Sequence, residues 1–154
     1  MSDLYEHIKA LMLEVPQFDM LSNEELDTLS HHVFHRRVPK GMVLCREGAV
    51  GDSLFYIVEG RIEIKKESFD GRQTVLAHFG KGSTVGEMSL VEESARSATA
   101  TAIEDTELLI LSRENFERML ADQPSIGVKV LRNIAKSLST RLRHTSGRFA
   151  DVFK

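Results

Sequence analysis

The segment "SLFYIVEGRIEIKKESFDGRQTVLAHF", residues 53–79, decides the fold class of this chain. Its middle part, RIEIKKE at 61–67, alternates isoleucine with charged residues, a period of two that is typical of a strand with one buried face. The dipeptide Asp70-Gly71 stands between two such runs and is a strong signal for a hairpin turn. The segment therefore predicts antiparallel strands joined by a tight turn.

The same kind of pattern extends on both sides of this segment. Eight of the ten glycines lie between residues 41 and 86, and short runs rich in β-branched and aromatic residues separate them. Further runs of this kind are MVLC (42–45), SATATAI (97–103) and ELLILS (107–112). Several short strands at roughly ten-residue spacing indicate an antiparallel barrel or sandwich, which we place at residues 33–112.

The N-terminal part, residues 1–32, has a helical period instead. Apolar side chains recur at helical spacing up to Pro16, which ends this run. Ser22 is followed three residues later by Glu25, the pattern of a capping box at the start of a helix. We therefore expect helices before the strands.

The C-terminal segment, residues 113–154, predicts two helices, the first opened by Ser112 or Arg113 and the second starting at Pro124. In the second helix, side chains recur alternately three and four residues apart, at Val128, Leu131, Ala135, Leu138, Leu142, Thr145, Phe149 and Val152. Such a sustained repeat is typical of a coiled-coil seam and favours dimerisation through this helix. The alternative is a long helix that packs on the body of its own chain.

The size and composition suit a single globular domain, residues 1–154, with 42% hydrophobic and 28% charged residues. No segment is long and apolar enough to cross a membrane, and the start of the chain has no basic leader. The single cysteine, Cys45, suits a reducing compartment, so we expect a cytoplasmic protein. We interpret Cys45 as a small buried side chain.

The net charge of −3 hides an asymmetry, because seven Lys/Arg residues and one acid lie from Pro124 onward. A basic tail is one signature of nucleic-acid binding. No winged or zinc-bearing motif accompanies this charge, so a solvated helix face is the favoured interpretation. We therefore expect no DNA-binding domain in this chain.

The segment "VGEMSLVEESARSATATA", residues 85–102, carries the candidate binding chemistry. Its part EMSL predicts one helical turn, whose first N–H groups form an anion site. Arg96 and Ser97 lie at the start of a predicted strand and suit a phosphate, whereas Glu87 suits a sugar hydroxyl. Together they describe a nucleotide site. A salt bridge between Glu87 and Arg96 that closes a loop is an equal alternative on spacing alone.

This segment also resembles the phosphate-binding cassette of the cyclic nucleotide-binding domain family, which includes the sensor domains of catabolite activator proteins and of protein kinase A regulatory subunits. The matching residues are Gly86, Glu87, Leu90, Arg96, Ala98 and Thr99. FDMLSNEELDTLS (18–30) and VPKGMVLCREGAVGDSLFYIVEGRIEI (38–64) are also similar to the family. The resemblance implies an α+β fold: an eight-stranded antiparallel, jelly-roll-like β-roll with flanking helices. The cassette, residues 85–99, would lie between the sixth and seventh strands.

The resemblance implies a role for each cassette residue. Arg96 would pair with the cyclic phosphate, Ser97 would add a phosphate contact, and Glu87 would hold the ribose 2′-hydroxyl. Backbone N–H groups would come from Gly86, Met88 and Ser89. The chain departs from the family pattern at Ala95, usually proline, and at Ser89, usually alanine or glycine.

The resemblance places base recognition in the last helix. LSTRLRHTSGRFADVF (138–153) is similar to the central helix of catabolite activator proteins, in which a Thr-Ser pair from the two subunits contacts adenine, and Thr145 and Ser146 match this pair. From the heptad pattern alone, Thr145 is equally a device that sets the register of the seam. Ser97 is closer to relatives that bind cyclic AMP than to those that bind cyclic GMP. We therefore expect cyclic AMP, with cyclic GMP as the alternative.

These features predict a non-catalytic, homodimeric cyclic nucleotide sensor that acts on an unidentified effector. Its ligand would favour one docking of the last helix over another. One alternative is a ligand-free dimerisation module of the same fold. The other is a metal-dependent cupin, for which His31, His32, His35 and His78 show no ligand set. We therefore expect no metal, no cofactor and no enzymatic activity.

Overall fold

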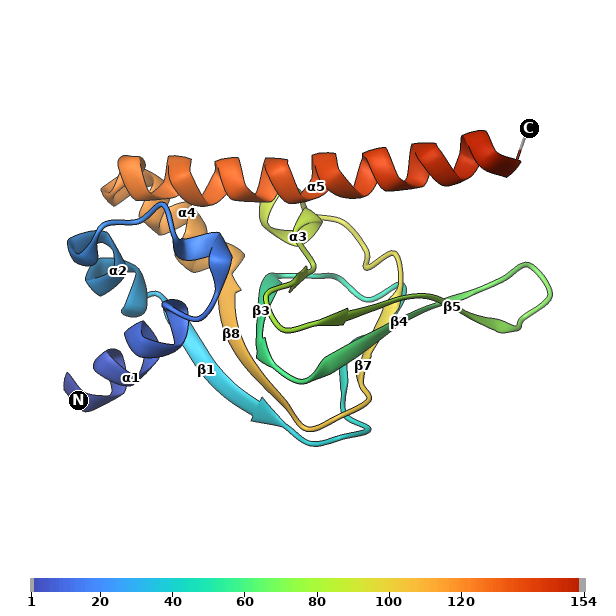
Figure 1. Ribbon diagram of the computed structural model, residues 1–154, viewed down its shortest axis with the longest axis horizontal. Coiled ribbons are helices and arrows are strands. Elements are labelled where there is room, and N and C mark those ends of the chain that lie inside the picture. Colours follow the sequence, from blue (N-terminus) through green and yellow to red (C-terminus); the bar gives the residue numbers. More distant parts are fainter. Residues whose placement is uncertain (1, 153–154) are drawn as a thin grey trace.

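The computed structural model describes residues 2–152, with side chains from residue 3 to residue 147 (Figure 1). Its helices are α1 (Ser2–Met12), the 3-10 helix η1 (Pro16–Phe18), α2 (Asn23–Ser30), α3 (Met88–Val91), α4 (Arg113–Asp122) and α5 (Pro124–Val152). Its strands are β1 (Val33–Val38), β2 (Val43–Cys45), β3 (Ser53–Glu59), β4 (Arg61–Glu67), β5 (Gln73–Gly80), β6 (Thr84–Val85), β7 (Thr99–Ala102) and β8 (Thr106–Ser112).

The strands form two four-stranded sheets in which every paired strand is antiparallel. The first sheet has the order β1-β8-β3-β6 and the second the order β2-β7-β4-β5. The eight antiparallel strands confirm the predicted β-roll. Helices α1 and α2 lie at one end of the roll, and the long α5 runs across it (Figure 1).

Strand β3 in the first sheet is buried on both faces, and this explains why it is almost continuously apolar. Leu54 and Tyr56 face the core beneath the helices, whereas Phe55 and Ile57 face the interior of the roll between the two sheets. A strand covered on both sides needs no polar face. By contrast β4 alternates, because only its inward side chains, such as Ile62, are buried.

The hairpin of β4 and β5 confirms the predicted turn at Asp70-Gly71. Gly71 has a φ of +80°, which favours glycine, and the Asp70 carboxylate accepts a hydrogen bond from the Arg72 N–H at 3.2 Å. This hairpin extends away from the body of the roll (Figure 1).

The N-terminal helices follow the predicted pattern with one correction. The capping box at the start of α2 is confirmed: the Ser22 hydroxyl accepts from the Glu25 N–H at 3.2 Å, and the Glu25 carboxylate accepts from the Ser22 N–H at 2.8 Å. The first helical run does not continue to Pro16, however. Helix α1 ends at Met12, and Pro16 opens η1 instead, the position that its fixed φ suits.

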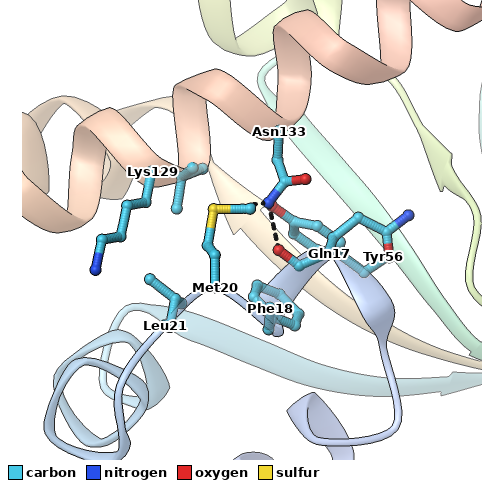
Figure 2. A pocket seen from close by; sticks show the side chains of 8 residues that line it. Gln17, Phe18, Met20, Leu21, Tyr56, Lys129 and Asn133 are labelled. Atoms are coloured by element: carbon cyan, nitrogen blue, oxygen red, sulfur yellow. Dashed lines mark hydrogen bonds between the residues drawn. The ribbon is translucent and has the colours of Figure 1, made fainter.

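Helix α5 begins at Pro124 as predicted, and one of its faces packs on the body of the chain. Ile126, Val130 and Ile134 are buried in the core beneath the helices. Close to this face, the Asn133 side chain donates a hydrogen bond to the backbone oxygen of Gln17, beside Met20, Phe18 and Tyr56 (Figure 2). The alternative interpretation, a helix docked on its own chain, therefore holds for this face.

The predicted heptad seam lies on a different face of α5. Val128, Leu131 and Leu142 are exposed, with Leu142 at 67%, and Leu138 is partly buried. The last two seam positions, Phe149 and Val152, lie outside the residues whose side chains are described. No helix within residues 2–152 combines the length and the hydrophobicity that a membrane crossing requires.

Candidate functional site

The cassette segment lies between β6 and β7. Gly86 follows β6 with a φ of +90°, a conformation that glycine adopts without strain, and Glu87 then leads into the single turn of α3. Gly86 therefore turns the chain from strand into helix, and its missing Cβ leaves space on the inner side of the turn.

Arg96 fills this space from the loop that precedes β7. Its Nη2 donates to the backbone oxygen of Ser53 at 2.9 Å, and its guanidinium carbon lies 5.6 Å from the ring centroid of Phe55. Its Nη1 is buried and has no hydrogen-bond partner among the described residues. Because buried N–H groups are nearly always paired, this cationic donor is suited to an acceptor from outside the chain.

Two glycines make the position of Arg96 possible. A Cβ on Gly86 would overlap Nη1 of Arg96 and lie 2.9 Å from the backbone oxygen of Ser53. A Cβ on Gly51 would lie 2.5 Å from Nε of Arg96 and overlap the hydroxyl of Ser89. Ser89 is itself buried, so this departure from the family pattern fits because residue 51 has no side chain.

Backbone hydrogen bonds and a second arginine hold the cassette loop. The Arg96 N–H donates to the Ala49 oxygen at 2.7 Å, and the Gly48 N–H donates to the Arg96 oxygen at 2.9 Å. Nη1 of Arg113 donates to the backbone oxygens of Gly51 at 3.0 Å and Ser89 at 2.9 Å. Arg113 is thus a positioning residue that connects α4 to both sides of the site, and no motif in the sequence pointed to it.

Glu87 lies on the side of the cassette that faces α5, and its side chain is only 3% exposed. Its Oε1 accepts hydrogen bonds from the hydroxyls of Thr84 and, at 3.4 Å, of Ser137. Its Oε2 accepts from Nη1 of Arg141 at 2.7 Å. A buried carboxylate requires such a charged partner, so Glu87 and Arg141 form an ion pair that connects the cassette to α5.

Arg141 is the main site residue that sequence reasoning missed. Besides Glu87, it contacts the backbone oxygen of Thr84 and the ring of Phe79, whose centroid lies 4.5 Å from the guanidinium carbon. Arg141 is off the heptad seam and follows the docking face of α5, four residues after Ser137. A second periodicity, Ile126, Val130, Ile134, Ser137 and Arg141, was the signal in the sequence that marks this face.

A groove of about 450 Å³ runs beside the Glu87–Arg141 pair. It lies between α5 and the segment joining β5 to β6, and its walls include Thr84, Ser137 and Arg141, three partners of Glu87. Lys136 and His144 add further basic side chains. The α5 side of the site is therefore open and lined by basic side chains.

Of the predicted site residues, Gly86, Ser89 and Arg96 lie in direct contact. The side chains of Met88 and Ser97 are exposed. The Ser89 N–H donates to the Gly86 oxygen at 3.1 Å. A phosphate contact by the backbone N–H groups of Gly86, Met88 and Ser89 remains a prediction.

Two further expectations concern side chains on either side of the site. The alternative salt bridge between Glu87 and Arg96 is not formed within the described residues: Nη2 of Arg96 donates to the Ser53 oxygen, and Glu87 pairs with Arg141. Thr145 and Ser146 are exposed on α5, and the residues of this helix that contact Glu87 are Ser137 and Arg141, the latter one helical turn before Thr145. A base contact by Thr145 or Ser146 therefore remains a prediction.

Two titratable side chains close to the site are shifted by their surroundings. Burial, and then the nearby Glu87 carboxylate, raises the pKa of Tyr56 well above its ordinary value. Burial likewise raises the pKa of the Cys45 thiol, although the Arg96 charge opposes this shift. Because the thiolate is the reactive form, Cys45 is suited to packing rather than to nucleophilic chemistry.

Comparison with known proteins gives the family to which this sequence is similar. A family profile described as "Cyclic nucleotide-binding domain" matches residues 35–123. The cyclic AMP receptor protein of Thermus thermophilus is 35% identical over 128 residues, which are 83% of this chain and 57% of that protein. A CRP-like cAMP-activated global transcriptional regulator of Mycobacterium tuberculosis is 32% identical over 114 residues, 74% of this chain and 49% of that protein. The chain thus spans about half the length of these two relatives.

Solved structures give the same result for the fold. The crystal structure of a cyclic nucleotide-binding domain from Methylobacillus flagellatus has a TM-score of 0.84 and 30% sequence identity, and the match covers 97% of this chain and 84% of that one.

Proposed function

Because the chain belongs to the cyclic nucleotide-binding domain family, we propose that it is a non-catalytic sensor that binds cyclic AMP and signals by changing the docking of α5. Such a ligand has two distinct ends, a cyclic phosphate with one negative charge and a ribose with a 2′-hydroxyl. Arg96 and Glu87 suit these two ends by charge and by hydrogen-bonding capacity.

The observation that carries the proposal is the buried, unpaired Nη1 of Arg96. A phosphate oxygen on this donor would complete the guanidinium's hydrogen bonding, and the backbone packed against the Arg96 side chain is glycine at Gly51 and Gly86. Anions are bound most strongly by cationic donors that are already held in place, as Ser53 and Phe55 hold Arg96.

Glu87 supplies the connection between ligand and helix. A carboxylate offers about four lone-pair sites, and Arg141, Thr84 and Ser137 occupy three of those of Glu87. A ribose hydroxyl that donates to Glu87 would share this carboxylate with Arg141 of α5. Ligand binding and helix docking are then linked through one buried group, and each changes the free energy of the other.

The preference for cyclic AMP is supported by the relatives, two of which are named for that nucleotide. In a homodimer formed through the exposed seam of α5, Thr145 and Ser146 of one chain would reach the base bound by the other. Leu131 and Leu142 supply apolar contacts for this seam.

Calorimetric titration of the purified chain with cyclic AMP and with cyclic GMP tests the proposal. We expect saturable binding that is tighter for cyclic AMP, and Arg96→Leu should weaken it by about 2–5 kcal/mol, roughly thirty- to several-thousand-fold. Arg72→Leu is the matched control, because Arg72 is 85% exposed in the β4–β5 hairpin. Normal binding by the Arg96 variant would exclude the phosphate assignment.

The ligand-free dimerisation module makes the opposite prediction. It requires a dimer with neither binding heat nor thermal stabilisation at millimolar concentrations of either nucleotide. The ion pair of Glu87 and Arg141 would then be structural only. Because both outcomes are measured on the same preparation, one titration separates these two functions.

A further inference from the structure

Three side chains with metal-ligand chemistry meet on the outside of the first sheet, away from the cassette. His7 comes from α1, His35 from β1 and Glu107 from β8, and one ligand atom of each lies within 4.8 Å of the other two. Nε2 of His35 is 2.9 Å from Oε2 of Glu107, and the rings of His7 and His35 meet edge to face with centroids 5.1 Å apart.

The β1–β8 ladder and the position of α1 explain this meeting. Arg37 is the direct partner of Glu107 in the antiparallel register, and His35 lies two residues from Arg37 on the same side of β1. His35 and Glu107 are therefore diagonal neighbours, which long side chains bridge across a sheet. Helix α1 carries His7 to the same place. Since the three residues are far apart in the sequence, no ligand spacing is visible there.

We propose that His7, His35 and Glu107 form a binding site for a divalent transition metal ion of the zinc class, which fastens α1 to the first sheet. Two imidazoles and one carboxylate are a ligand set that Zn²⁺ accepts, with water in the remaining position. His35 and Glu107 are mostly buried and are already held by each other. His7 is exposed, so its ring is free to adjust toward the ion and the ion has a path to the site.

One neighbouring charge opposes metal binding. Nε of Arg37 donates to the same Oε2 of Glu107 at 3.1 Å, and the Arg37 side chain is 77% exposed. A cation at the site would share the carboxylate with this guanidinium and be repelled by it. Removal of the Arg37 charge is therefore expected to strengthen metal binding, an effect opposite to that of removing a ligand.

The test is a calorimetric titration of the metal-stripped full chain with Zn²⁺ alone. We expect one ion per chain. His7→Ala and His35→Ala should each weaken Zn²⁺ binding by more than about tenfold, because loss of a group that merely supports a metal ligand already lowers metal affinity by about 10- to 100-fold. Arg37→Gln should tighten binding. His78→Ala is the matched control, because His78 also pairs with a glutamate, Glu63 at 3.0 Å, on the other sheet.

Amide hydrogen exchange supplies a second readout that does not depend on heats of binding. Zn²⁺ should slow exchange in α1 of the wild-type chain and leave it unchanged in His7→Ala, whose altered side chain is exposed and leaves the core intact. Equal Zn²⁺ affinity in the wild type, His7→Ala and His35→Ala would overturn the proposal, as would loss of the site in His78→Ala.

Discussion

Arg141 of α5 donates from Nη1 to Oε2 of Glu87 at 2.7 Å, so the long helix is bound directly to the buried carboxylate of the cassette. The contact joins residues 54 positions apart in the chain. It also makes one carboxylate common to the candidate ligand site and to the helix. The first prediction concerns this pair.

A double-mutant cycle of Glu87→Gln and Arg141→Gln should give a coupling energy of about 0.5–3 kcal/mol in thermal or denaturant unfolding, because the two groups are in contact. Arg141→Gln should also change the affinity for cyclic AMP, since ligand and helix share Glu87. Arg143→Gln is the control on the same helix, because the hydrogen bonds of Arg143 to side chains between residues 3 and 147 go to two α5 hydroxyls, those of Ser139 and Thr140. If the stability losses of the two single variants add up to that of the double variant, the pair contributes no coupling energy.

Gly86→Ala should destabilise the fold and abolish ligand binding. The new Cβ would overlap Nη1 of Arg96 and press on the backbone oxygen of Ser53, in addition to the strain of a φ of +90°. Gly48→Ala separates these effects, because Gly48 has a φ of +86° with nothing within 4 Å of the added atom. We expect about 1–2 kcal/mol of strain for Gly48→Ala with binding retained, measured by unfolding and calorimetry. Equal behaviour of the two variants would contradict a specific role for Gly86.

Leu142→Glu should convert the dimer to a monomer in sedimentation analysis. Leu142 is 67% exposed on the predicted seam, and a charge at such a position opposes the burial that a coiled coil requires. Leu13→Glu is a matched control, because Leu13 is 65% exposed and lies just after α1, away from the seam. A wild-type monomer, or a dimer that survives Leu142→Glu, would exclude dimerisation through this face.

Thr145→Val should weaken the binding of cyclic AMP and leave that of cyclic GMP nearly unchanged. The change removes a hydroxyl at constant shape, and the two nucleotides differ only in the base that this hydroxyl would contact. Calorimetry with both nucleotides measures the selectivity directly. An equal loss for both would remove Thr145 from base recognition and leave it as a register residue of the seam.

The Glu25–Lys129 pair, which joins α2 to α5 at 2.7 Å, predicts a pH dependence of stability. Hydrogen bonds from Lys129 and from the Ser22 N–H lower the pKa of Glu25. The depressed pKa means that the stabilisation is complete above the ordinary carboxyl range and is lost as pH falls through the folded-state value. Glu25→Gln retains a capping side chain but loses the charge, so it should cost up to about 1 kcal/mol at pH 7.

Thermal unfolding between pH 7 and pH 3 measures this effect. The stability difference between the wild type and Glu25→Gln should shrink as the solution is acidified. Glu24→Gln, at the exposed neighbouring position in the same helical turn, should show a smaller difference at neutral pH. A constant difference across the whole range would exclude a role for the ionised Glu25.

Much of the architecture was predictable because it depends on local patterns. The alternation in β4, the Asp-Gly turn, the capping box at Ser22 and the start of α5 at Pro124 each follow from a few adjacent residues. The cassette was predictable for the same reason, since Gly86, Glu87 and Arg96 lie within one short segment. The end of α1 was not, because several apolar residues at helical spacing do not determine where the last turn opens.

The heptad of α5 illustrates the limit of such patterns. It predicted one apolar face, and the helix has two, because residues such as Val130 and Ile134 bury a second face against the chain's own core. A hydrophobic period in one sequence shows which residues share a helix face, but it does not show what each face packs against.

By itself the sequence determined a series of antiparallel strands between two groups of helices, because local spacing decides which backbone conformations and which faces are available. The resemblance of its motifs to the family added the β-roll and the cassette. Only the tertiary structure decided that Glu87 pairs with Arg141 rather than with Arg96, and that His7, His35 and Glu107 meet. Both are contacts between elements far apart in the chain. The free energy of a buried charge depends on which groups surround it in space, and packing alone brings those groups together.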